Sequence, residues 1–289
     1  MEPAHTAHYA DRAVQATVAI EANEPVARNT FRLRFRFPEL AERITPGQFL
    51  MIRLDGFDDP LIGRPLALFD TGGAGGREFV EVVYLLSGKM TTRLAQYQPG
   101  QKIVVWGPLG NGFAPANVDH LLMVAGGIGQ TPFLALAKEH LGIQAYGDGS
   151  RPVCRAGRVT LCYGARSADL LAGVAEFERA GVTVHAFTED GSAGRKGLVT
   201  EGLRELLDVG QQESRRVVAC GPEGMLKAVS QLVAAYPVSA QVSLETPMAC
   251  GIGICFSCVA SVRDHEGHVD YRRTCVEGPV FEAGDICWD

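Results

Sequence analysis

The sequence lacks the features of three classes of protein: nucleic-acid binders, membrane proteins and exported proteins. Its 289 residues include 27 Lys and Arg against 33 Asp and Glu, with no basic run, so no surface would neutralise phosphates along a duplex. The most apolar stretch, residues 121–129, is far below the roughly 20 residues that span a bilayer. No apolar leader precedes Arg12. We therefore expect a soluble protein of the cytoplasm that binds neither nucleic acid nor membrane.

Internal repeats and low-complexity tracts are also lacking, and three segments of different composition are present instead. In residues 13–115, short β-rich runs alternate with Gly and Pro turns, which favours a small β-barrel. Residues 116–242 alternate apolar strands with helix-like runs, which is typical of a parallel nucleotide-binding α/β sheet. Residues 243–289 are rich in Cys and Gly and too few to hold a core without a metal. The predicted fold class is multidomain, a β-barrel plus an α/β domain with a small C-terminal domain.

The turn signals delimit individual elements within these segments. In the first segment we expect strands at 17–22, 30–37, 49–54, 79–86 and 102–106. In the second we expect strands at 121–125, 158–163, 182–188 and 216–220, alternating with helices at 132–140, 168–180, 198–207 and 222–235. Residues 144–157 are expected to form an exposed loop.

Four of the eight cysteines are concentrated near the C-terminus. They are Cys250, Cys255, Cys258 and Cys275, with the spacing C-x4-C-x2-C…C of plant-type [2Fe–2S] ligands. Glycines between the first two allow the chain to wrap tightly around a small cluster. A structural zinc site or unligated thiols are the alternatives, although zinc sites usually combine two C-x2-C-like pairs. Cys154, Cys162 and Cys287 lack such spacing and are expected to pack as small apolar side chains or to lie at the surface.

A glycine-rich turn follows the strand expected at 121–125 and opens a helix. Such a turn lets the backbone approach a pyrophosphate, while the helix N-terminus supplies N–H donors. The candidate cofactor contacts are Gly126, Gly127, Gly129, Thr131 and Pro132. The match to G-x-G-x-x-G is partial, because Pro132 replaces the third glycine, so a tight turn without a ligand is the alternative.

Cys220 ends the strand expected at 216–220, where a thiol could touch a nicotinamide ring, and it is the candidate for catalysis. Burial as a small apolar residue is the alternative. Arg166 stands after the second strand, where an acid would bind a ribose hydroxyl, so the choice between NAD and NADP stays open.

Two segments of the barrel region are candidates for flavin binding. Arg64 could bind a pyrophosphate with two parallel hydrogen bonds, and Pro65 fixes the strand geometry beside it. Residues 88–92 start a helix-like run whose free N–H groups could hold the other phosphate. A surface arginine and an ordinary helix cap are the alternatives.

In this order and over about residues 14–289, these motifs resemble the ferredoxin–NADP reductase superfamily. More narrowly, the chain is similar to electron-transfer subunits of type B dihydroorotate dehydrogenase; the strongest matches are residues 248–258, 275–281 and 107–113. The resemblance implies FAD in the barrel, NAD in the α/β domain and a [2Fe–2S] cluster at the C-terminus. The FAD contacts it implies are Arg64, Pro65, Leu66, Ala67, Val83, Tyr84, Leu85, Met90 and Thr91. In the family, Ser or Thr, Arg and Gly usually stand in place of Ala67, Leu85 and Met90.

The resemblance also implies a function and a partner. Electrons would pass from the FMN of a dihydroorotate dehydrogenase catalytic subunit through the cluster and FAD to NAD+, in pyrimidine (UMP) biosynthesis, within a heterotetramer of two copies of each subunit. Phe256, Val280 and Phe281 are candidate partner contacts, with core packing as the alternative. Rival functions are a flavin subunit of another redox complex of hydrogenase or sulfide-dehydrogenase type, a free-standing NAD(P)H reductase, and a zinc-stabilised binding module.

Overall fold

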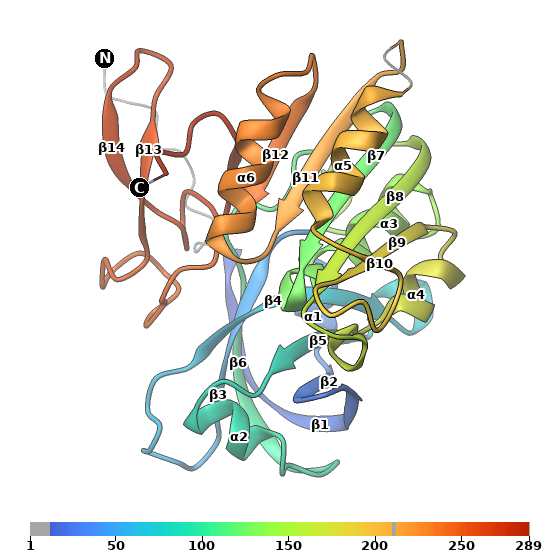
Figure 1. Ribbon diagram of the computed structural model, residues 1–289. Helices are drawn as coiled ribbons and strands as arrows, with labels where there is room; N and C mark the ends of the chain where they lie inside the picture. Colours follow the sequence, from blue (N-terminus) through green and yellow to red (C-terminus); the bar gives the residue numbers. More distant parts are fainter. Residues whose placement is uncertain (1–11, 210–211, 289) are drawn as a thin grey trace.

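The structure is a computed structural model that describes residues 12–209 and 212–288. Its first six strands form a closed barrel, and side chains along them alternate between the buried interior and the outer face. In β2, Leu33 and Phe35 are buried while Arg32 and Arg34 lie on the outer face, as a strand with one buried face requires. The barrel order is β1-β2-β5-β4-β3-β6 (Figure 1). The strands are β1 (Val14–Ala27), β2 (Thr30–Arg36), β3 (Phe49–Leu54), β4 (Arg64–Gly72), β5 (Phe79–Leu85) and β6 (Lys102–Leu109), accompanied by α1 (Pro38–Ala41) and α2 (Lys89–Leu94).

A seven-stranded sheet follows, in the order β10-β9-β8-β7-β11-β12-β15. Its parallel strands are β7 (Val118–Gly126), β8 (Ala156–Ala165), β9 (Thr183–Thr188), β10 (Arg195–Lys196), β11 (Arg215–Cys220) and β12 (Ser239–Ser243). Its helices are α3 (Phe133–His140), α4 (Val174–Arg179), α5 (Val199–Asp208) and α6 (Glu223–Val233). Helices α3 and α4 lie against one face of the sheet, and α5 and α6 lie against the other (Figure 1). Their apolar side chains pack into a separate core on each face. Both faces are therefore buried, which explains the continuous apolar run of β7.

The C-terminal segment forms a small cysteine-rich lobe beside β12, coloured red in Figure 1. β13 (Val259–Arg263) pairs with β14 (Val269–Arg273) as an antiparallel hairpin. β15 (Val280–Glu282) then leaves the lobe and pairs antiparallel with β12, so the lobe contributes the last strand of the nucleotide sheet. Two sections of the chain that differ widely in composition thus share one sheet.

Two local predictions differ from the structure. The helix expected at 168–180 is broken, because Gly173 has φ +77° and separates a 3-10 turn at Ala168–Leu170 from α4. The loop at 144–157 is not exposed throughout: Tyr146 and Cys154 are only 4% and 1% exposed. Their burial against α3 and the barrel was invisible in a sequence rich in Gly and Arg. None of the helices within the described ranges has the length and apolar character needed to cross a membrane.

Candidate functional site

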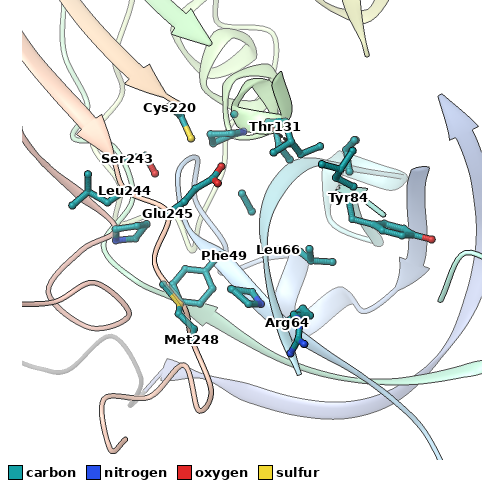
Figure 2. Close-up of a pocket in the computed structure, with 18 of the residues that line it drawn as sticks. Phe49, Arg64, Leu66, Tyr84, Thr131, Cys220, Ser243, Leu244, Glu245 and Met248 are labelled. Atoms are coloured by element: carbon teal, nitrogen blue, oxygen red, sulfur yellow. Dashed lines mark hydrogen bonds between the residues drawn. The ribbon is translucent and has the colours of Figure 1, made fainter. Parts of the chain in front are cut away.

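A cavity of about 390 Å³ opens where the barrel, the nucleotide sheet and the cysteine-rich lobe meet. This volume is typical of cofactor sites. Figure 2 shows Cys220, Ser243 and Glu245 on one side of it and Leu66 and Tyr84 on the other. The cavity is lined by Gly47, Phe49, Arg64, Pro65, Leu66, Ala67, Val83, Tyr84, Leu85, Ser87, Thr91, Ile128, Gly129, Thr131, Pro132, Cys220, Ser243, Leu244, Glu245, Thr246, Met248 and Pro279.

The barrel wall of the cavity comes from β4 and the end of β5. Arg64 donates hydrogen bonds from Nη1 to the carbonyls of Ile62 and Gly63, at 3.2 and 3.1 Å, which hold its guanidinium at the cavity edge. The Tyr84 hydroxyl donates to Asn23 Oδ1 at 2.9 Å, and burial raises its pKa well above the usual value. The Tyr84 ring is only 1% exposed and packs in the barrel core, so it supports this wall from behind.

Helix α2 contributes one of its two predicted contacts to this wall. The hydroxyl of Thr91 accepts hydrogen bonds from the backbone N–H groups of Ser87 and Gly88, at 3.1 and 3.2 Å, and so shapes the start of α2. Met90 is fully buried in the barrel core, and its side chain does not line the cavity. The other barrel residues predicted to contact FAD all border the cavity.

The glycine turn between β7 and α3 forms the opposite wall. A Cβ on Gly129 would lie 2.2 Å from the carbonyl oxygen of Cys220, so only glycine allows β11 and the turn to pack this closely. Gly126 is similarly confined, with Pro222 Cδ at 2.7 Å, and Gly127 has φ +54°. Three of the predicted residues line the cavity, Gly129, Thr131 and Pro132, whereas Gly126 and Gly127 support the turn behind them.

Cys220 and Glu245 lie close together at the sheet end of the cavity (Figure 2). Burial raises the pKa of the Cys220 thiol far above its usual value, and the nearby Glu245 charge acts in the same direction, so the thiol is neutral at physiological pH. Among the described residues that line the cavity, Glu245 is the one carboxylate and Arg64 the one cation.

Glu245 was not identified from the sequence. Burial raises the pKa of its carboxyl, and in the described part of the chain it has no hydrogen-bond or ion-pair partner. Glu245 as a whole residue is exposed, and it is the perturbed pKa of its carboxyl at the cavity that marks it as a candidate functional residue. The available signal was its position, shortly after the buried strand β12 and shortly before the first cysteine of the motif.

The four cysteines of the motif form two pairs of thiols. Cys250 and Cys255 interact with each other and form the outer pair, because Cys255 is exposed. Cys258 and Cys275 interact with each other and form the inner pair, each only 1% exposed. Across residues 12–209 and 212–288, no three of these sulfurs lie within 4.8 Å of one another. Four thiolates at about 2.3 Å from a single zinc would all lie within about 4 Å of each other, so the paired arrangement fits two irons better than one zinc.

Hydrogen bonds from both neighbouring parts of the fold hold the ligand loop. The Trp106 indole N–H, on barrel strand β6, donates to the Cys250 carbonyl at 3.2 Å. The Thr274 hydroxyl donates to the Cys258 carbonyl at 3.0 Å, and the Ile252 N–H points at the Cys250 sulfur at 3.5 Å. Such contacts orient thiolates and tune the metal that they hold.

Another buried group with metal-ligand atoms serves a structural role. Glu139, His140 and Cys154 lie close together, but both Glu139 oxygens accept hydrogen bonds from Arg151, at 2.6 and 2.8 Å. The guanidinium occupies the place where a cation would bind, and it fixes the segment that follows α3 to that helix.

Three family models match consecutive parts of the chain. Residues 17–113 match an oxidoreductase FAD-binding domain, and residues 123–231 match an oxidoreductase NAD-binding domain. Residues 245–287 match the iron–sulfur cluster binding domain of dihydroorotate dehydrogenase B. The predicted cofactors, FAD, NAD and the iron–sulfur cluster, are thereby confirmed at the level of domains.

Curated relatives match over nearly the whole chain. A dihydroorotate dehydrogenase B (NAD(+)) electron transfer subunit from Desulforamulus reducens is 33% identical over 265 residues, which are 91% of this chain and 95% of that protein. The protein of the same name from Geobacillus sp. (strain WCH70) is 36% identical over 278 residues, 94% and 98% of the two chains.

Solved structures share the fold. A chain of the NADH-dependent reduced ferredoxin-NADP oxidoreductase, studied for flavin-based electron bifurcation, is 28% identical with a TM-score of 0.75, covering 95% of this chain and 91% of that one. Phthalate dioxygenase reductase aligns with a TM-score of 0.60 at 16% identity, over 91% and 94% of the two chains. The predicted fold class is confirmed.

Proposed function

Because this chain belongs to the family of dihydroorotate dehydrogenase B (NAD(+)) electron transfer subunits, we propose that it passes electrons from the FMN of a catalytic subunit through a [2Fe–2S] cluster and FAD to NAD+. The observation that carries the proposal is one cavity bordered by the FAD-binding barrel, the nucleotide sheet and the cysteine-rich lobe. A flavin exchanges a hydride with a nicotinamide and single electrons with a cluster, so it belongs at that junction. The pathway served is pyrimidine (UMP) biosynthesis.

The residues of the chain divide the work between the two cofactor sites and the cluster. Arg64 neutralises the flavin pyrophosphate, and the apolar edges of β4 and β5 bind the flavin ring. Gly129 and the start of α3 receive the nicotinamide nucleotide, and Cys220 contacts its ring as a neutral thiol. The outer and inner thiol pairs would together hold the iron–sulfur cluster, which supplies one-electron transfer when bound.

The partner in this proposal is an FMN-containing catalytic subunit, in an assembly of two copies of each chain. We propose that the partner docks at the outer thiol pair. Ile254 and Phe256 beside Cys255 support this position, because they are 71% and 63% exposed and form an apolar surface. Val280, a candidate contact from the sequence, is buried in the core and does not contribute. Eight free cysteines are compatible with a reducing compartment, and we place the complex in the cytoplasm.

The test is anaerobic purification of the protein alone and with the proposed partner. We expect FAD, iron and acid-labile sulfide in the isolated chain, oxidation of NADH with artificial acceptors, and no oxidation of dihydroorotate until the partner is added. A colourless protein without iron would refute the cofactor assignment, and dihydroorotate turnover by the isolated chain would refute the division of labour. The mass of the purified complex tests the stoichiometry.

A second candidate function is electron transfer in another flavin complex. The 28% identity to a chain of the NADH-dependent reduced ferredoxin-NADP oxidoreductase favours it. Purification of the tagged protein from native cells distinguishes the two functions, because the co-purifying subunit either oxidises dihydroorotate or does not.

A further inference from the structure

The inner thiol pair and the cavity are joined by two side chains. Cys258 and Cys275 lie in an apolar group with Phe49, Met51, Leu109 and Val276, against which Ala13, Trp106 and Met248 also pack. We call this set the inner apolar group. Among the described residues, two of its members also line the cavity: Phe49 and Met248. Both are drawn in Figure 2 at the same side of the cavity.

Each of these two side chains is anchored by a part of the fold that carries a cofactor. Phe49 lies on β3, only 4% exposed, and its backbone pairs with Ala67 of the flavin wall and with Leu109 of the inner apolar group. Met248 lies two residues before the ligand Cys250, in the segment that leads from β12 into the ligand loop. The contact is thus built from one residue of the barrel and one of the lobe.

We propose that Phe49 and Met248 are positioning residues for electron transfer, which fill the gap between the inner thiol pair and the flavin and exclude water from it. This inference rests on the function proposed above. An aromatic ring and a polarizable thioether give a closely packed, dry contact. The outer pair faces the exposed apolar surface, so the cluster has a flavin side and a partner side.

The step that depends on this contact is a one-electron transfer. In the proposed direction, two electrons would cross this contact one at a time from the cluster to FAD, and with one proton they would give the reduced flavin that passes a hydride to NAD+. With NADH as donor the same contact would be crossed in reverse: FAD would accept the hydride, NAD+ would leave, and one electron would pass from the reduced flavin to the oxidised cluster.

A matched control exists within the inner apolar group. Met51 is fully buried in it but does not line the cavity, and its side chain packs against Gly251 of the ligand loop. Met248→Ala and Met51→Ala remove the same atoms from contact with the inner apolar group, Met248 from a half-buried position and Met51 from a fully buried one, but only Met248 also borders the cavity.

The experiment uses the flavin- and cluster-loaded protein, mixed anaerobically with NADH. Stopped-flow absorbance follows flavin reduction, and rapid-freeze EPR follows the reduced cluster. In Met248→Ala we expect unchanged flavin reduction, several-fold slower cluster reduction, and unchanged midpoint potentials and iron content. Met248→Leu should restore the rate, and Met51→Ala should match the wild type. If Met248→Ala loses iron, Phe49→Leu tests the same contact from the barrel side.

Equal cluster-reduction rates in Met248→Ala and Met51→Ala would overturn the inference, whether or not both are slower than the wild type. If Met248→Ala loses iron, a wild-type rate of cluster reduction in Phe49→Leu would overturn it instead. A protein that binds no flavin or iron would instead refute the proposed function. The two failures are distinguishable, because only the first occurs in protein whose flavin is still reduced by NADH.

Discussion

Replacement of Trp106 by Phe should loosen the ligand loop without emptying the flavin site. The Trp106 indole N–H donates to the Cys250 carbonyl at 3.2 Å and so connects barrel strand β6 to the residue that begins the cysteine motif. Phenylalanine keeps an aromatic ring but cannot donate. The backbone carbonyl of Cys250, the first ligand residue, would then lose its hydrogen-bond donor.

The magnitude follows from the cost of an unpaired carbonyl in a partly buried position, about 1–2 kcal/mol. If iron leaves through local opening of the loop, that free energy increases the open population about 5- to 30-fold. We expect iron loss to accelerate by the same factor, while FAD content stays unchanged, because the flavin wall formed by β4 and β5 is untouched.

The assay is anaerobic transfer of iron to a coloured chelator, with flavin absorbance as the internal reference. Trp288→Phe is the matched control, because the Trp288 indole N–H is buried without a hydrogen-bond partner in the described part of the chain. Both variants exchange the same rings, so Trp288→Phe measures the cost of that exchange at a position away from the inner apolar group. Equal iron-loss rates in the two variants would refute the reasoning, and loss of FAD together with iron would refute the separation of the two sites.

Three further changes test other parts of the site. Cys255→Ser should abolish the cluster spectrum but retain FAD, and flavin loss measured in the same sample would contradict this. Glu245→Gln should raise the melting temperature more at about pH 8 than at about pH 4. A carboxyl whose pKa is raised in the folded protein destabilises the fold once the pH exceeds the pKa of that carboxyl in the unfolded chain. Equal gains in melting temperature at the two pH values would contradict the raised pKa of Glu245. Gly129→Ala should lower the free energy of unfolding by about 1–3 kcal/mol and weaken NADH binding, since its Cβ would meet the Cys220 carbonyl. The control Gly224→Ala, with nothing within 4 Å, should leave NADH binding unchanged in the same titration.

The sequence was most informative where function depends on local spacing. The three ligands Cys250, Cys255 and Cys258 lie within one loop, so their spacing alone indicated the cluster that the family model confirms. The strand–turn–helix around Gly129 was equally local, and its domain type is confirmed as well. The individual FAD and nucleotide contacts remain predictions, supported by their place around one cavity.

The sequence was least informative where neighbours come from distant segments. β4 was not predicted as a strand, because the run that begins at Arg64 contains Pro65 and lacks a clear period of two. The strand forms because its backbone pairs with β3 on one side and β5 on the other. Met248 and Phe49 are distant in sequence, and no periodicity connects them. Their adjacency to the cavity arises from the closure of the barrel against the lobe, which only tertiary structure reveals.

The pairing of β15 with β12 has a consequence for how the complex can move. Many redox chains carry their metal centre on a tethered module that swings between donor and acceptor, and such motion needs a hinge on each side of the module. Here the last strand of the lobe is hydrogen-bonded into the nucleotide sheet, and Asn111 of the barrel side donates to the Val280 carbonyl at 2.7 Å. The lobe is therefore anchored on both sides of its cysteines, by β12 before Cys250 and by β15 after Cys275. In such an arrangement electrons would cross a gap of constant width, and a change of acceptor would require a different protein to dock against the same face.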